Sequence, residues 1–253
     1  MSGRGLLVMK DNLAVTYARL GRLDRAASMG RDVYNGYLKL TGEESRDTLL
    51  AALNYAVVLK NSVRFEAAKT LLRKTIPVAR RVFGEDNELT LKMRKIYAKA
   101  LYKDPAATLD DLREAVTTLE DAKRIARRVL GGAHPDTAGI EAALRSARAA
   151  LRALETLVDN LRKAVKKLED ALPDARRDLG SSDPLVGSME RNLRDSRAAL
   201  RARDTTYIER DLQDARAELS ARTDEMHDPN KGMADIVKFF AAIKPYDGGK
   251  ETK

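Results

Sequence analysis

Residue types that commonly carry out catalysis are scarce in this chain. Among 253 residues there is no cysteine, and the two histidines are His134 and His227. Each could act as a base or a metal ligand, but neither has a second histidine or a cysteine near it in the sequence. A linker histidine at His134 and a solvated turn at His227 are therefore the favoured interpretations. Phosphate-loop, dinucleotide-binding, zinc-peptidase and serine-hydrolase motifs are also missing. The sequence predicts no enzymatic activity, no metal site and no cofactor.

Adjacent carboxylates, which can serve in acid–base catalysis, occur at Asp110–Asp111 and Glu120–Asp121. Both pairs lie in segments of helical spacing that are rich in arginine. Carboxylates stabilise the first turn of a helix, and they pair with basic side chains one turn away. We interpret both pairs as helix-start charges and salt-bridged faces.

Positive charge is concentrated in the first two-fifths of the chain. The formal net charge is +9; residues 1–100 carry 19 Lys and Arg against 10 Asp and Glu, whereas residues 101–253 carry 28 of each sign. A local excess of positive charge attracts anionic partners. In the second half, arginines and carboxylates interleave at helical spacing and are expected to cross-link neighbouring turns.

The elements that position these charges repeat along the chain. Three segments close with the similar sequences ARRVFG, ARRVLG and ARRDLG, which end at Gly84, Gly131 and Gly180. Glycine is the residue expected where a helix ends in a left-handed turn, and a polar linker and a new helix start follow each one. Equivalent linker threonines lie 42 and then 47 residues apart, and later helical segments recur after 49 residues. These boundaries divide an array over residues 1–226 into units of about 6–42, 43–84, 85–131, 132–180 and 181–226.

Apolar residues within the units follow the period of a helix. Leu13, Tyr17 and Leu20 are three or four residues apart, and later segments repeat this spacing. Alternating strand patterns and tight hairpin turns are absent. The sequence predicts an all-α fold, an α-solenoid of about five stacked antiparallel helix pairs.

The first units resemble a known family. NLAVTYARLGRLDRA, at Asn12–Ala26, and the linker GGAHPDT, at Gly131–Thr137, resemble the tetratricopeptide repeat (TPR) of the kinesin-light-chain type. The resemblance extends over residues 6–137 and weakens beyond. It implies a non-catalytic scaffold whose first helices line a concave, basic groove for acidic, aromatic-containing peptides.

The resemblance also projects particular side chains onto that groove. The asparagines are expected to hold the backbone of an extended peptide, since an amide both donates and accepts, and the lysines to attract its acidic side chains. The projected residues are Asn12, Arg19, Asn54, Lys60, Asn61, Lys95, Lys99, Tyr102 and Lys103. A lysine-rich helix face exposed to solvent is the alternative interpretation.

The C-terminal segment, 227–253, is expected to contain a linker, an amphipathic helix and a flexible tail. One face of that helix is apolar, formed by Met233, Ile236, Val237, Phe240 and Ile243. It is interpreted as a cap on the last repeat, because stacking leaves a terminal apolar face open. The alternative is a helix that docks into another protein.

Three functions are open at this point. The first is an adaptor that binds an acidic peptide or protein surface through its basic groove. The second is a structural subunit of a large assembly, held by its convex face and C-terminal helix. The third, binding of nucleic acid, is disfavoured because few aromatic residues accompany the basic ones. No secretory signal or membrane span is evident, so a cytoplasmic or other reducing compartment is expected.

Overall fold

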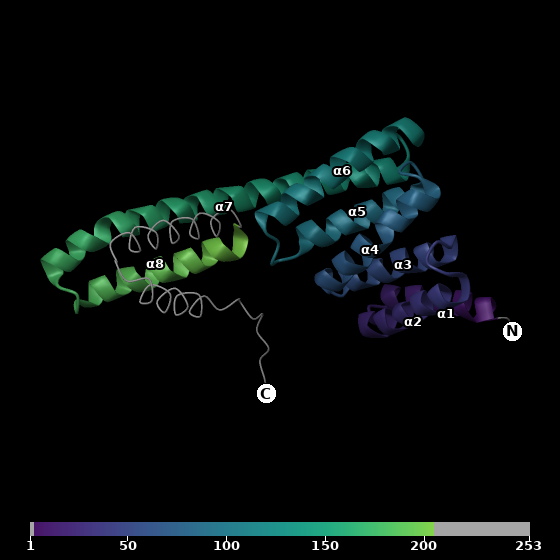
Figure 1. Cartoon of the computed structure of the whole chain (residues 1–253), viewed down its shortest axis with the longest axis horizontal. Coiled ribbons are helices and arrows are strands. Elements are labelled where there is room, and N and C mark those ends of the chain that lie inside the picture. The colour runs from purple at the N-terminus through teal and green to yellow at the C-terminus, as the bar shows by residue number, and fades with distance from the viewer. Residues whose placement is uncertain (1–2, 205–253) are drawn as a thin grey trace, which may run out of the picture. The chain divides into compact units, whose positions relative to one another are not determined.

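The computed structural model describes residues 3–204, which form eight α-helices (Figure 1). The predicted C-terminal helix and the end of the last predicted unit lie outside this range. The helices are α1 (Gly3–Arg19), α2 (Leu23–Thr41), α3 (Arg46–Asn61), α4 (Phe65–Phe83), α5 (Glu88–Lys103), α6 (Leu109–Val129), α7 (Pro135–Leu179) and α8 (Pro184–Arg203).

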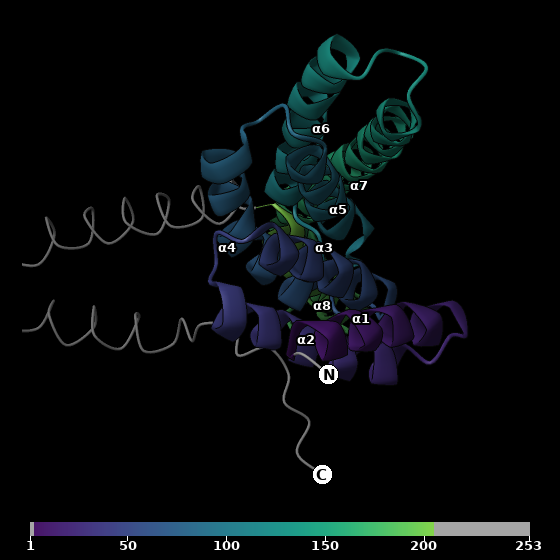
Figure 2. The ribbon, with the colours of Figure 1, turned by 90° about the vertical axis from the view of Figure 1, so that its right-hand side faces the viewer.

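Successive helices pack as pairs that stack on one another (Figures 1 and 2). Each helix contacts the next in the chain, and the first helices of neighbouring units, α1, α3, α5 and the beginning of α7, also contact one another. The largest apolar cluster runs from α3 to α7 and includes the fully buried Leu49, Leu72, Leu91 and Ile140. Burying a leucine stabilises the fold by roughly 1.5–3 kcal/mol. The predicted all-α solenoid is confirmed.

Local sequence explains where the helices begin and end. Glycines at the predicted positions adopt positive φ angles, 89° at Gly84 and 85° at Gly131, which a side chain disfavours. The next helix then begins with a side chain that accepts a hydrogen bond from the backbone. Ser45, Asn87, His134 and Asp183 fill this N-cap position for α3, α5, α7 and α8. The linkers therefore specify the repeat boundaries by themselves.

The unit expected at residues 132–180 departs from the prediction. Instead of a helix pair it contains one continuous helix, α7, of 45 residues. The helix pair predicted there was wrong. The sequence between Ile140 and Leu172 contains no glycine or proline, so no residue in it ends the helix. Alanine, leucine, arginine, lysine and glutamate dominate that stretch, and all favour the helix. Pro173 does not end α7, which continues to Leu179.

The 49-residue recurrence corresponds to a repeated contact between helices. Two cross-helix ion pairs join α6 to α7, and two more, each 49 residues further along on both sides, join α7 to α8. They are Arg127–Glu141 at 2.7 Å, Arg148–Glu120 at 2.6 Å, Arg176–Glu190 at 2.6 Å and Arg197–Glu169 at 2.6 Å. Between α7 and α8 the buried residues recur every seven positions, as in an antiparallel coiled coil. These are Val158, Val165 and Leu172 of α7, and Val186, Leu193 and Leu200 of α8.

Candidate protein-binding surface

Three of the projected lysines form one electrostatic cluster on the first helices. Lys60 lies in the last turn of α3, while Lys99 and Lys103 lie in the last turns of the neighbouring α5. Burial lowers the pKa of the Lys60 ammonium, and the charges of Lys103 and Lys99 lower it further. Burial likewise lowers the pKa of Lys99, with added repulsion from Lys95 and Lys103. The cluster therefore consists of like charges close enough to repel one another. We call Lys60, Lys99 and Lys103 the lysine cluster.

The lysine cluster has no carboxylate partner within residues 3–204. Lys60 Nζ donates a hydrogen bond to the side-chain oxygen of the exposed Asn61, at 2.6 Å. No ion pair within that range involves Lys60, Lys99 or Lys103. Lys103 is exposed, whereas Lys60 and Lys99 are half-buried. An anionic ligand would meet partly desolvated charges with no competing carboxylate, which strengthens the attraction.

Lys95, also projected onto the groove, forms an ion pair with a neighbouring helix. Its ammonium lies 2.8 Å from Asp136, in the first turn of α7, and Lys92 lies 3.4 Å from the same carboxylate. The side chains of Lys95 and Asp136 are 15% and 14% exposed. This ion pair joins α5 to α7, so Lys95 holds two units together in addition to facing the surface.

Asn54 is also engaged with a neighbouring helix. Its side-chain amide donates to the Asp11 carboxylate of α1 at 2.9 Å. Burial raises the pKa of Asp11, and the hydrogen bond from Asn54 lowers it in part. Asn12 and Arg19 of α1 are exposed. The α1 end of the surface is thus a mixture of polar and charged groups, and the positive charge gathers on α3 and α5.

Tyr102 links the surface to α7. The ring packs against the main apolar cluster. Burial raises the pKa of its hydroxyl, and a hydrogen bond with Ser146 of α7 lowers it in part. Tyr102 is half-buried, and it directly precedes Lys103 of the lysine cluster.

The sequence analysis did not predict two contacts between neighbouring first helices, Lys95–Asp136 and Asn54–Asp11. They are separated by 41 and 43 residues, close to one repeat length. Complementary polar residues about one repeat apart in neighbouring first helices are the signal that could have found them. His134 has a structural role as well: its Nδ1 accepts from the Asp136 backbone N–H at 3.2 Å. Among residues 3–204 no group of three or more metal-ligating side chains occurs, and none of the helices there is long and apolar enough to cross a bilayer.

Comparison with known proteins agrees with this architecture. A family model described as tetratricopeptide repeat matches residues 6–47, 48–88 and 107–136. A search of curated proteins finds no match. Among solved structures, the chain is similar to two crystal structures of a Podosopora anserina putative kinesin light chain with nearly identical TPR-like repeats.

The two structural likenesses extend over most of both chains. One of them, a single-substitution variant, has 19% sequence identity and a TM-score of 0.54, covering 89% of this chain and 100% of that chain. The other has 20% identity and a TM-score of 0.52, covering 80% and 92%. At this identity the likeness concerns the fold. The chain therefore contains tetratricopeptide repeats over the matched residues, and its fold is similar to that of the kinesin-light-chain repeats.

Proposed function

We propose that this protein is an adaptor that binds an acidic peptide, or an acidic protein surface, across α3 and α5. TPR repeats serve as scaffolds for protein–protein interaction, and stacked helix pairs offer an extended surface for a partner. The observation that carries the proposal is the lysine cluster, three neighbouring ammonium groups without carboxylate partners in residues 3–204.

Binding of an acidic ligand is expected to be favourable because it reduces the repulsion among the lysines of the cluster. Lys60 and Lys99 are partly desolvated and repel their neighbours, and a carboxylate between them would offset both costs. Charge-assisted hydrogen bonds to lysine are short and about twice as strong as neutral ones. Tyr102 and Asn61 border the cluster, so an aromatic residue and the backbone of the peptide have neighbours to contact.

The test is a charge reversal with a matched control. The binding variant carries Lys60→Glu, Lys99→Glu and Lys103→Glu. The control variant carries Lys163→Glu, Lys166→Glu and Lys167→Glu, on exposed positions of α7. Both variants change the net charge equally, so a nonspecific loss of positive charge affects both. The natural chain is first screened against a displayed library of random peptides, and the selected peptides are then measured by fluorescence anisotropy.

We expect the screen to enrich Asp- and Glu-rich peptides. The binding variant should bind the selected peptides more weakly than the natural chain does, on the order of 100-fold, whereas the control variant should bind them equally well. Added salt should weaken the binding of these peptides to the natural chain. Selection of peptides without acidic residues, or equal losses in both variants, would contradict the proposal. Tight binding of single-stranded oligonucleotides that is lost only in the binding variant would favour nucleic acid as the partner.

A further inference from the structure

The first helix exposes an apolar stripe on the side away from α3. Leu6, Met9 and Leu13 of α1, with Leu20 directly after its last residue, recur at helical spacing, and their exposed fractions are 46%, 57%, 43% and 66%. Residues three, four and seven positions apart lie on one face of a helix. We call these four residues the α1 stripe.

The equivalent positions in later units are covered. In α3, 42 residues further on, they include Thr48 and Ala51, which are 1% and 3% exposed. Tyr55, equivalent to Leu13, packs its ring against Gly30 of α2. Met93 of α5 and Ile140 of α7, at the position of Met9, are fully buried.

The covering element in each later unit is the second helix of the preceding unit. α2 contacts α3, α4 contacts α5, and α6 contacts α7. Within residues 3–204 no helix occupies this place on α1. The repeat therefore presents a face whose geometry is already adapted to one packed helix.

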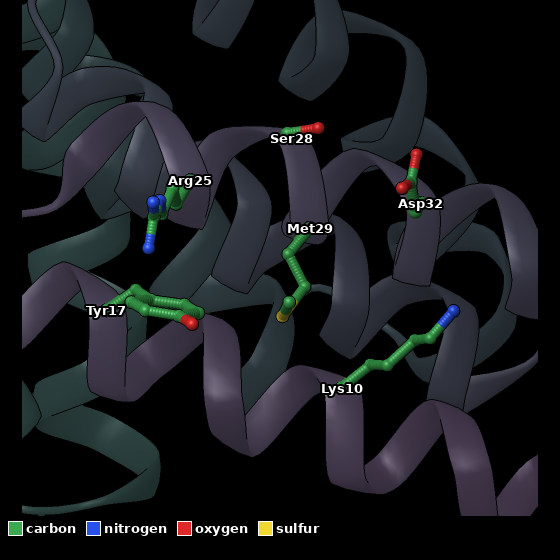
Figure 3. Close-up of a pocket in the computed structure, with 6 residues that line it drawn as sticks. All are labelled: Lys10, Tyr17, Arg25, Ser28, Met29 and Asp32. Carbon is green, nitrogen blue, oxygen red and sulfur yellow. The ribbon is translucent and has the colours of Figure 1, made fainter.

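A shallow pocket of about 320 Å³ carries positive charge, and its lining includes Lys10 and Tyr17, which lie three and four residues from Leu13 of the α1 stripe. It lies between α1 and α2, and Figure 3 shows Met29 between Tyr17 and Lys10, with Arg25 beside Tyr17. The Arg25 guanidinium lies 6.0 Å from the centre of the Tyr17 ring. Neither Lys10 nor Arg25 forms an ion pair within residues 3–204, and Asp32, the acidic residue in the pocket lining, lies 3.8 Å from Arg31.

We propose that the α1 stripe is the docking site of a partner's amphipathic helix, with acidic residues along the flank that meets Lys10 and Arg25. The apolar face of the partner helix would pack on the α1 stripe as α2, α4 and α6 pack on α3, α5 and α7. Its carboxylates would neutralise the two unpaired cations of the pocket. A second copy of this chain fits less well, because it would bring the same two cations, Lys10 of α1 and Arg25 of α2, to the interface.

The probe is a synthetic amphipathic peptide of about 18 residues, with leucines at three- and four-residue spacing and glutamates on the flanks. A tryptophan in the peptide reports binding, because the chain itself contains none. The same peptide with lysines on the flanks is the charge control. Binding to the full chain is followed by tryptophan fluorescence.

We expect the glutamate peptide to bind at least 10-fold more tightly than the lysine peptide. Leu13→Glu should weaken it at least 10-fold, and Lys10→Glu with Arg25→Glu should reverse the preference between the peptides. Leu185→Glu, on a residue of α8 that is 57% exposed, is the matched control and should leave binding unchanged. Circular dichroism checks that each variant folds.

Three results would overturn the inference. The two peptides could bind equally, or Leu13→Glu could leave binding intact. Alternatively, the natural chain could sediment as a dimer that Leu13→Glu dissociates, and a second copy would then be the occupant. The triple variant of the lysine cluster should still bind the glutamate peptide, so failure of the groove proposal and failure of this one are distinguishable.

Discussion

The lysines of α5 are of two kinds, those that form an ion pair and those that do not. Lys95 neutralises Asp136 at the start of the next unit, whereas Lys99 and Lys103 have no carboxylate partner in residues 3–204. The first kind contributes to stability and the second is available to a ligand. A charge reversal at Lys95 would therefore disturb the fold as well as binding, and this is why the proposed binding variant leaves it unchanged.

The Lys95–Asp136 pair makes a prediction about pH. Burial raises the pKa of the Asp136 carboxyl, but the hydrogen bond and charge of Lys95, with the charge of Lys92, outweigh it and hold the pKa below its ordinary value. A carboxyl whose pKa is lowered in the folded state stabilises the fold above its unfolded pKa. That stabilisation is lost as the pH falls through the folded pKa.

We expect Asp136→Asn to lower the free energy of unfolding by about 2 kcal/mol at neutral pH. The difference from the natural chain should narrow once the pH falls below about 4. Urea unfolding followed by circular dichroism at several pH values measures it. Asp195→Asn, on an exposed residue of α8, is the control and should change little. A difference that stays constant with pH would show that the ion pair is not its source.

At the scale of the elements, the linkers decide where one helix ends and the next begins. Gly131 and Gly132 are neighbours in such a linker, and a Cβ at either would meet nothing within 4 Å. Only Gly131 has a positive φ, of 85°. Since a Cβ is crowded at neither position, a comparison of the two isolates the effect of backbone strain.

We expect Gly131→Ala to destabilise the chain by about 1–2 kcal/mol, because a Cβ disfavours the left-handed conformation. Gly132→Ala should be close to neutral. Urea denaturation of both variants, made side by side, gives the comparison. Equal effects would mean that the linker relaxes to another conformation when Gly131 is replaced.

The recurrence at 49 residues offers a second comparison between elements. Leu119 of α6 and Leu168 of α7 occupy equivalent positions in the repeated sequence. Leu119 is fully buried in the main apolar cluster, whereas Leu168 is only half-buried.

We expect Leu119→Ala to cost about 2–5 kcal/mol, the range for a buried leucine. Leu168→Ala should cost clearly less, about 1 kcal/mol, since less apolar surface is removed from the interior. Thermal and urea unfolding of the two variants measure the difference. Similar losses would imply that Leu168 is as well covered as Leu119 in solution.

At the scale of the whole molecule, stability within residues 3–204 should be graded along the stack. In repeat proteins each unit interacts mainly with its neighbours, so units with neighbours on both sides are the most stable. α3 to α6 have a neighbour on each side, whereas α1 has none on the side of the α1 stripe.

We expect backbone amides of α3 to α6 to exchange with solvent most slowly, and those of α1 at least 10-fold faster. Hydrogen exchange followed by mass spectrometry gives the profile. Uniform protection from α1 to α6 would contradict the grading. Added glutamate peptide should slow exchange in α1 if the helix docks there, which links this measurement to the α1 stripe.

Much of the fold could be predicted from the sequence, because its determinants are local. The glycines that end helices, the capping side chains that begin them and the spacing of apolar residues all act within a few positions of one another. The same holds for the excess of positive charge in the first hundred residues. Lys60, Lys99 and Lys103 could be placed on first helices from the repeat alone.

What the tertiary structure decided is how each local element is used. The sequence of α7 favours a helix throughout, but its failure to fold back and its packing with α6 and then α8 follow from contacts between distant residues. Likewise, Lys95 and Lys99 are equivalent lysines one turn apart on the same helix, and only the arrival of Asp136 from the next unit separates their roles. Charge alone does not determine which carboxylate a lysine pairs with. The distance between the helices determines it, because ion pairing depends on the separation of two groups in space.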